Sequence, residues 1–179
     1  MHIVDAKNAV KIGDFKLRSD HANKIKLDYL SSVPNSMLID NAPRVYLLVV
    51  DGEIAKIGGS ASKGGIKSTM SFYVNAMQGS PGVPRFVIHL LIEQALLDKR
   101  SVQLWMIVSP SVKAQVNGLT KVEYLDVASF KEMEDLCKRE YFSLEGRYPI
   151  WNFQENNEPY PQKLSEMHNA YQRNRLARN

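Results

Sequence analysis

Glu140 stands out among the acidic residues because of its position in a predicted amphipathic helix. The helix is predicted to begin after Ser129 and to run to Leu144, and its apolar stripe includes Leu136 and Cys137. At about 100° per residue, Glu140 falls between the directions of these two side chains. An ionised carboxylate that points toward a core is costly unless a cation or hydrogen bonds compensate it. That cation is either a bound divalent metal or a lysine or arginine at the edge of the core.

Other kinds of catalytic site find little support in the sequence. The histidines are scattered, at His2, His21, His89 and His168, and no histidine or cysteine spacing fits a zinc site. The glycine-rich segment 58–65 fits neither a P-loop nor a dinucleotide-binding fingerprint. Transition-metal and nucleotide chemistry are therefore not indicated.

A β-hairpin is the clearest element that could position functional residues. Residues 45–50 form a run of β-branched, aromatic and aliphatic residues, Asp51-Gly52 is a strong turn signal, and residues 53–57 return as a second strand. Residues 101–108 predict a third strand, and residues 120–127 are a candidate for a fourth.

Helices are predicted between and after these strands, over residues 67–77, 84–99 and 129–144. The last has Ser129 as its N-cap and Gly146 as its stop. Its predicted apolar stripe comprises Phe130, Met133, Leu136, Cys137, Tyr141 and Leu144. Residues 1–43 form a polar extension with a short strand at 15–18 and a helix over about 20–31. This mixture of strands and helices predicts an α/β or α+β domain.

The composition fits one domain with a polyanionic partner, although it does not require one. A chain of 179 residues can bury one substantial core, and its net charge of +4 is mildly basic. The apolar runs are too short to span a membrane, and the N-terminus lacks the order of a secretory signal. Because Cys137 is the single cysteine, no internal disulfide can form, so we expect a reducing, cytoplasmic location.

Two pairs of short motifs resemble those of the GIY-YIG nuclease family. In that family a metal-binding glutamate precedes a proline by nine residues and a structural asparagine by twelve, and Glu140, Pro149 and Asn152 have these spacings. The opening motifs are matched by Arg44-Val45-Tyr46 and, about ten residues on, by Lys56-Ile57-Gly58. Lys56 stands where most members have a tyrosine, which resembles some restriction-enzyme members.

The resemblance assigns roles to individual residues. Tyr46 becomes the general base, Lys56 favours its phenolate form, and Glu140 holds Mg²⁺ or Mn²⁺. Lys67 falls where the family places a phosphate-contacting arginine, and the alternatives are Lys63 and Arg85. The resemblance further implies that Tyr73 supplies another hydroxyl and that Asn152 is structural. Without the resemblance, Tyr46 would be an ordinary core aromatic of a strand.

The resemblance also implies a fold and a function. We expect a small antiparallel three-stranded central sheet flanked by helices, with a core at about 44–152, an N-terminal extension 1–43 and a basic C-terminal tail 153–179. Arg173 and Arg175 are candidate DNA contacts in that tail. The implied function is a sequence-specific type II restriction endonuclease that acts on double-stranded DNA as a homodimer. The alternatives are a non-catalytic DNA-binding module of the same fold and a nonspecific, RNA or repair nuclease.

Overall fold

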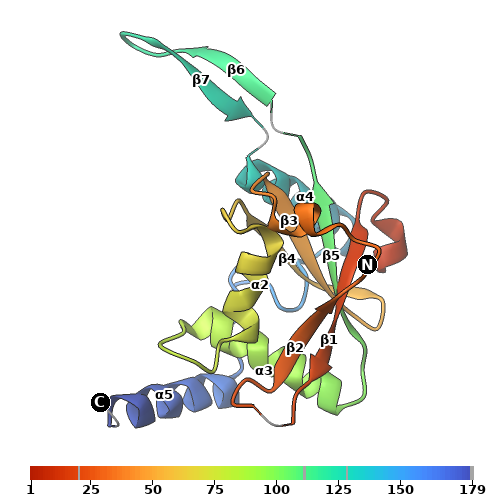
Figure 1. The fold of residues 1–179 in the computed structure, drawn as a ribbon, viewed down its shortest axis with the longest axis vertical. Helices are drawn as coiled ribbons and strands as arrows, with labels where there is room; N and C mark the ends of the chain where they lie inside the picture. The colour runs from red at the N-terminus through yellow and green to blue at the C-terminus, as the bar shows by residue number, and fades with distance from the viewer. Residues whose placement is uncertain (20, 111, 128, 178–179) are drawn as a thin grey trace.

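A five-stranded antiparallel sheet forms the centre of the computed structural model (Figure 1). The structure describes residues 1–19, 21–110, 112–127 and 129–177, without the side chains of residues 125–127. The strand order is β2-β1-β5-β3-β4. The strands are β1 (Val10–Leu17), β2 (Ile25–Tyr29), β3 (Arg44–Val50), β4 (Glu53–Ser60) and β5 (Val102–Val108).

The prediction of a three-stranded sheet is wrong because the N-terminal extension adds two strands. β1 pairs with β5 and contains the predicted short strand, while β2 occupies a segment predicted to be helical. Ile25, Leu27 and Tyr29 are more buried than Lys26 and Asp28 between them. This alternation is the period of a strand, and pairing with β1 satisfies the backbone of the segment.

The predicted hairpin is confirmed as β3 and β4. Asp51 and Gly52 both adopt positive φ angles, 50° and 87°, as a tight hairpin turn requires. Every residue of β3 is buried, since β3 lies between β4 and β5 and its alternate side chains enter core clusters on both faces of the sheet. The register places Tyr46 opposite Gly58, so the ends of the two opening motifs lie side by side.

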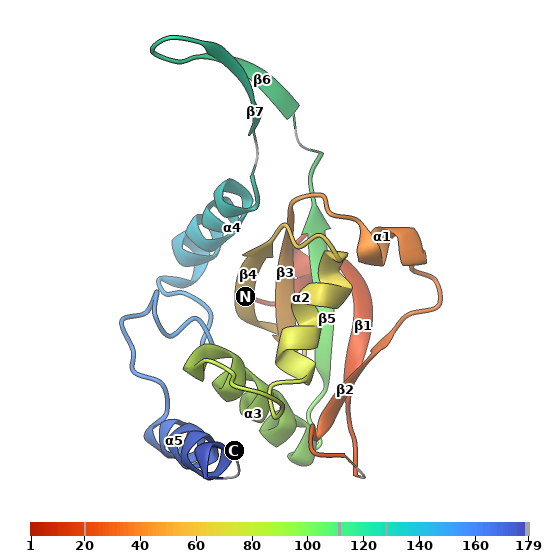
Figure 2. The same ribbon diagram turned by 60° about the vertical axis from the view of Figure 1, so that its left-hand side comes forward.

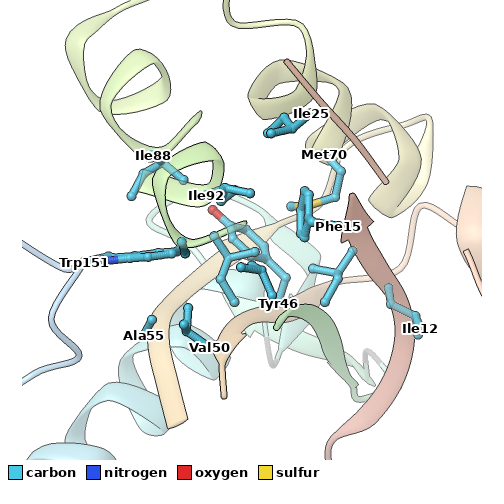
Figure 3. Packing of buried hydrophobic residues seen from close by; sticks show 14 of the residues in the cluster. Ile12, Phe15, Ile25, Tyr46, Val50, Ala55, Met70, Ile88, Ile92 and Trp151 are labelled. Carbon is cyan, nitrogen blue, oxygen red and sulfur yellow. The ribbon is translucent and has the colours of Figure 1, made fainter. Parts of the chain in front are cut away.

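Helices cover both faces of the sheet (Figure 2). The structure contains η1 (Ile3–Asp5), α1 (Asn35–Ile39), α2 (Gly65–Val74), α3 (Val83–Leu97), α4 (Phe130–Glu145) and α5 (Gln162–Leu176). α2 and α3 contribute Met70, Ile88 and Ile92 to a core cluster that also contains Tyr46 (Figure 3). α4 contributes Met133 and Tyr141 to a second cluster on the other face, and α5 packs against α3.

α4 has the ends that the sequence predicts, and its buried face is only part of the predicted apolar stripe. Ser129 and Glu132 form a capping box, which contributes about 0.5–2 kcal/mol, and Gly146 ends the helix with a φ of 71°. Leu136 and Leu144, two members of the predicted apolar stripe, are 50% and 68% exposed. The buried face is therefore narrower than the predicted stripe and is centred on two of its members, Met133 and Tyr141.

The segment between β5 and α4 forms a separate two-stranded sheet. β6 (Val112–Asn117) and β7 (Val122–Val127) pair with each other and project from the body of the molecule (Figures 1 and 2). The candidate fourth strand thus exists, but it does not extend the central sheet. Among the described residues, no helix is long and apolar enough to cross a bilayer.

Candidate active site

Two tyrosine hydroxyls meet at the edge of the central sheet. Tyr46 on β3 and Tyr73 on α2 form a hydrogen bond of 2.8 Å between their hydroxyl oxygens, and their rings pack edge to face with centroids 6.1 Å apart. The carbonyl oxygen of Tyr73 is 2.8 Å from Nδ1 of the buried His89 on α3. The contact between α2 and α3 therefore fixes the position of Tyr73 in this pair.

Glycines on β4 make room for the groups around Tyr46. The Tyr46 ring crosses Gly58, and a Cβ added there would collide with the ring and the hydroxyl. A Cβ at Gly59 would come within 2.5 Å of the carboxylate of Glu134. Adjacent strand residues face opposite sides of a sheet, so these two positions let a tyrosine from one face and a carboxylate from the other approach the same edge.

Glu134, Lys138 and Glu155 form a charged cluster beside this edge. Lys138 Nζ lies 2.6 Å from Glu134 and 2.5 Å from Glu155, and the three side chains are 14–29% exposed. Burial alone would lower the pKa of Lys138, but the two carboxylates raise it above its usual value. Burial opposes a low pKa for Glu155, yet the ion pair with Lys138 holds it below the usual range. Glu155 is therefore ionised at neutral pH while Lys138 keeps its charge.

The carboxylates also act on Tyr46 and Lys56. Burial raises the pKa of Tyr46 well above its usual value, and Tyr73 and the charges of Glu134 and Glu155 raise it further. Burial lowers the pKa of Lys56, and the same two carboxylates oppose that change. The expected lowering of the Tyr46 pKa by Lys56 is thus not found, because desolvation and negative charge outweigh it in this arrangement.

Asn152 holds β4 in place next to the cluster. Its side chain accepts a hydrogen bond from the Ile57 backbone N–H at 2.9 Å and donates one to the Ile57 carbonyl at 3.0 Å. Asn152 is 1% exposed, so both bonds are shielded from water. They fix the segment after α4, and with it Glu155, against the strand that carries Lys56.

The structure does not bring Glu140 together with Tyr46. Glu140 is exposed and lines a groove with Leu47 and Ile57, whose side chains lie on the face of the sheet opposite to that of Tyr46. Glu134 is turned by about 120° from Glu140 around the helix axis. α4 packs on β4 and β3, and in this packing the carboxylate of Glu134 lies against Gly59 of β4. Glu134 rather than Glu140 therefore faces the tyrosine edge.

The predicted phosphate-contacting cations lie in different places. Lys67 donates a 2.6 Å hydrogen bond to Asn35 and lies 5.5 Å from the ring centroid of Tyr29. It is turned by about 120° around α2 from Tyr73. Arg85 stacks on the ring of Phe72 at 4.0 Å. Burial raises the pKa of Tyr73, and the positive charge of Arg85 opposes this change. Arg85, one of the alternatives from the sequence, is thus a cation whose charge acts on the hydroxyl pair.

The remaining basic candidates lie outside this cluster. Lys63 is exposed in the loop between β4 and α2. Arg173 and Arg175 belong to the last turn of α5, at the end of the molecule opposite the β6–β7 hairpin (Figure 1). They remain candidate DNA contacts away from the hydroxyl pair.

The sequence reasoning missed Glu134, Lys138 and Glu155 as a group. One signal was available, because Glu134, Lys138 and Tyr141 share a helix direction at the spacing i, i+4 and i+7. Nothing in the sequence connects Glu155 to them, since it lies in an irregular segment placed by the Asn152 hydrogen bonds.

The carboxylates of the cluster suit a hard divalent cation. Mg²⁺ is held in proteins by one or two carboxylates together with water and substrate oxygens. Glu134 and Glu155 provide two carboxylates that a single ammonium already bridges. Among the described residues, no group of three or more His, Cys, Asp or Glu side chains lies close enough for an all-protein site. The donor set therefore fits Mg²⁺ or Mn²⁺ shared with a substrate.

Comparison with known proteins supports the fold. No protein-family model and no curated protein sequence matches the chain. The structure of a point mutant of bacteriophage T4 EndoII is similar, with a TM-score of 0.52 and 15% identity over 85% of this chain and 98% of the phage chain. The restriction endonuclease HPY188I in complex with product DNA gives a TM-score of 0.48 and 16% identity over 84% of each chain. The chain thus shares the fold of T4 EndoII.

Proposed function

We propose that this protein is a metal-dependent endonuclease that hydrolyses phosphodiester bonds in double-stranded DNA. The observation that carries the proposal is the Tyr46–Tyr73 hydroxyl pair beside the Glu134 carboxylate. The motif resemblance to GIY-YIG nucleases and the fold shared with the phage endonuclease T4 EndoII support it.

The roles of the residues follow from their surroundings. Glu134, with Glu155 beside it, would hold Mg²⁺ or Mn²⁺, which would neutralise charge on a phosphate oxygen and offset the effect of the carboxylates on the Tyr46 pKa. Tyr46 in its phenolate form accepts the proton of the attacking water as the water oxygen bonds to phosphorus and the P–O bond to the leaving oxygen breaks. Tyr73 orients the Tyr46 oxygen through their hydrogen bond, and Arg85 contacts the phosphate from the Tyr73 side.

Lys56 and Lys138 complete the charge balance of the site. Two lysines and two carboxylates lie together, so the cluster is close to neutral before a phosphate and a metal enter. Lys138 pairs with both carboxylates and holds them next to each other, and Lys56 supplies a second positive charge near them. We further propose that the protein cuts as a sequence-specific type II restriction enzyme and acts as a homodimer, because two-fold dimers match palindromic sites.

A non-catalytic DNA-binding module is the second candidate. The raised pKa of Tyr46 favours it, because a phenol that stays protonated cannot act as a base. Such a protein would bind duplex DNA and leave it intact at every pH.

Incubation of supercoiled plasmid with the protein and Mg²⁺ tests both candidates. Discrete fragments would support a sequence-specific nuclease, whereas a smear would indicate a nonspecific nuclease. Binding in a gel-shift assay without cutting, in Mg²⁺ or Mn²⁺, would contradict the nuclease proposal and support the module. An RNA substrate and a flapped or nicked duplex, run in parallel, identify a preference for RNA or repair intermediates.

A further inference from the structure

The β6–β7 hairpin has two faces of different chemistry. Directly paired residues of an antiparallel ladder lie on the same face, so Gln115 shares a face with Tyr124, and Asn117 with Val122. Lys113 lies on this face as well, since side chains alternate along a strand. The opposite face carries Val112, Ala114, Val116 and Glu123.

The polar face is open to solvent. Lys113, Gln115 and Asn117 are exposed, and Tyr124 is 69% exposed. An isolated two-stranded ribbon is only marginally stable in water, and this one makes its strand pairs only within itself in the described part of the chain. A folded ribbon held away from the body is a feature that a binding partner would use.

The hydrogen-bonding groups on this face match the edges of bases. The amide of glutamine or asparagine can bond an adenine edge with both a donor and an acceptor, lysine donates to guanine, and an apolar side chain contacts the methyl group of thymine. A two-stranded ribbon also fits the width of the major groove. Lys121 forms an ion pair with Glu123, so the described side chains give the ribbon little net charge. Base contacts therefore suit it better than a purely electrostatic grip on phosphates.

Both ends of the hairpin are attached beside the candidate active site. β5 ends at Val108, which pairs with Arg44, two residues before Tyr46. β7 ends at Val127, three residues before α4 begins, and Glu134 lies in the first turns of that helix. With strands of about 20 Å, at roughly 3.3 Å per residue, the ribbon can reach into a groove while its base stays at the site.

We propose that the β6–β7 hairpin reads DNA sequence by inserting its polar face, Lys113, Gln115, Asn117 and Tyr124, into the major groove next to the cleaved bond. This inference rests on the proposed function, because it takes duplex DNA as the substrate. It names the hairpin as the source of sequence preference.

A binding selection separates this proposal from the nuclease proposal. The full-length protein is incubated in EDTA with duplexes that contain about 20 randomised base pairs, and the retained duplexes are sequenced. The wild-type protein is expected to enrich a sequence motif. The Gln115→Ala/Asn117→Ala double variant is expected to lose the preference at two or more positions and to bind the enriched duplex at least about 10-fold more weakly. Its affinity for unselected duplex should change by less than about threefold, since phosphate contacts remain.

The matched control changes the opposite face of the same strand. Val112→Thr/Val116→Thr should keep the enriched motif, and thermal unfolding of both double variants checks that they fold. The ribbon proposal would be overturned if the Gln115→Ala/Asn117→Ala variant enriched the same motif as the wild-type protein. It would also be overturned if neither the wild-type protein nor this variant enriched a motif. A fall in molecular mass from dimer to monomer in that variant would overturn it too, because the hairpin would then join two copies of the chain. Plasmid cutting in Mg²⁺ is scored separately, so a protein that selects a motif without cutting contradicts only the nuclease proposal.

Discussion

Glu134 and Glu140 lie on the same helix, yet their surroundings differ in almost every respect. Glu134 is ion-paired with Lys138, partly buried and close enough to Tyr46 to raise its pKa. Glu140 is exposed over a groove on the other face of the sheet. Two side chains six positions apart on a helix point about 120° away from each other, which is enough to place them on different faces of the helix. The contacts of a helix, and not its apolar pattern alone, therefore decide which carboxylate can reach the site.

The largest expected effect comes from neutralising Glu134, and neutralising Glu140 is the matched control. Glu134→Gln keeps the size of the side chain and removes its charge, so we expect Mg²⁺-dependent plasmid cleavage to fall about 1000-fold or more. Glu140→Gln should cut within about threefold of wild type, as expected for an exposed substitution. Loss of cleavage with Glu140→Gln and its retention with Glu134→Gln would instead make Glu140 the metal ligand, as the motif spacing predicts.

The hydroxyl pair should show a graded response. Tyr46→Phe removes the proposed base and keeps the ring, so the cleavage rate should fall about 100-fold or more. Tyr73→Phe removes only the orienting bond and should cost about 5-fold, because one hydrogen bond contributes about 1 kcal/mol. The measurement is the single-turnover rate between about pH 6 and 10. In wild type the rate should rise with pH as Tyr46 ionises, and a flat profile would remove Tyr46 from the role of base.

The two cations on and beside α2 provide the next contrast. Arg85→Ala should slow cleavage about 10- to 100-fold, because Arg85 is the cation near Tyr73 and its loss leaves the phosphate charge less compensated. Lys67→Ala should change the rate by less than about threefold, since Lys67 is hydrogen-bonded to Asn35 and points about 120° around the helix from Tyr73. Equal losses in both variants would show that the phosphate site extends around the N-terminal part of α2.

The smallest effect concerns stability and not cleavage. His89 is fully buried and its pKa is lowered by burial, although its bond with the Tyr73 carbonyl opposes this change. A lowered folded-state pKa gives stability that is present above the unfolded value of about 6.5 and is lost as the pH falls through the folded value. The urea midpoint should therefore drop between about pH 7 and 5. His89→Asn, which can still donate to the carbonyl, should flatten that drop, and an unchanged pH dependence would show that other groups cause it.

Much of the fold was predictable where local signals are strong. The β3–β4 hairpin followed from Asp51-Gly52 between apolar runs, and the ends of α4 followed from Ser129 and Gly146. β1 and β2 were harder because no local turn signal defines them: β1 pairs with β5, which is distant in sequence, and β2 is a short edge strand of five residues. Their alternation of buried and exposed residues is short, so the sequence pattern is weak.

Local signals are enough to predict the hairpin, the capped helix and the pairing of Tyr46 with the Lys56-Ile57-Gly58 strand, because each depends on turn chemistry or on contacts near in sequence. Long-range packing is what brings Glu134 and Glu155 to the tyrosine edge and makes Arg85 the predicted cation whose charge acts on Tyr73. The physical reason is that these groups come from separate elements, and the packing of α4 and α3 against the sheet sets their rotation. A change of one position along a helix turns a side chain by about 100°, and local patterns do not fix that rotation.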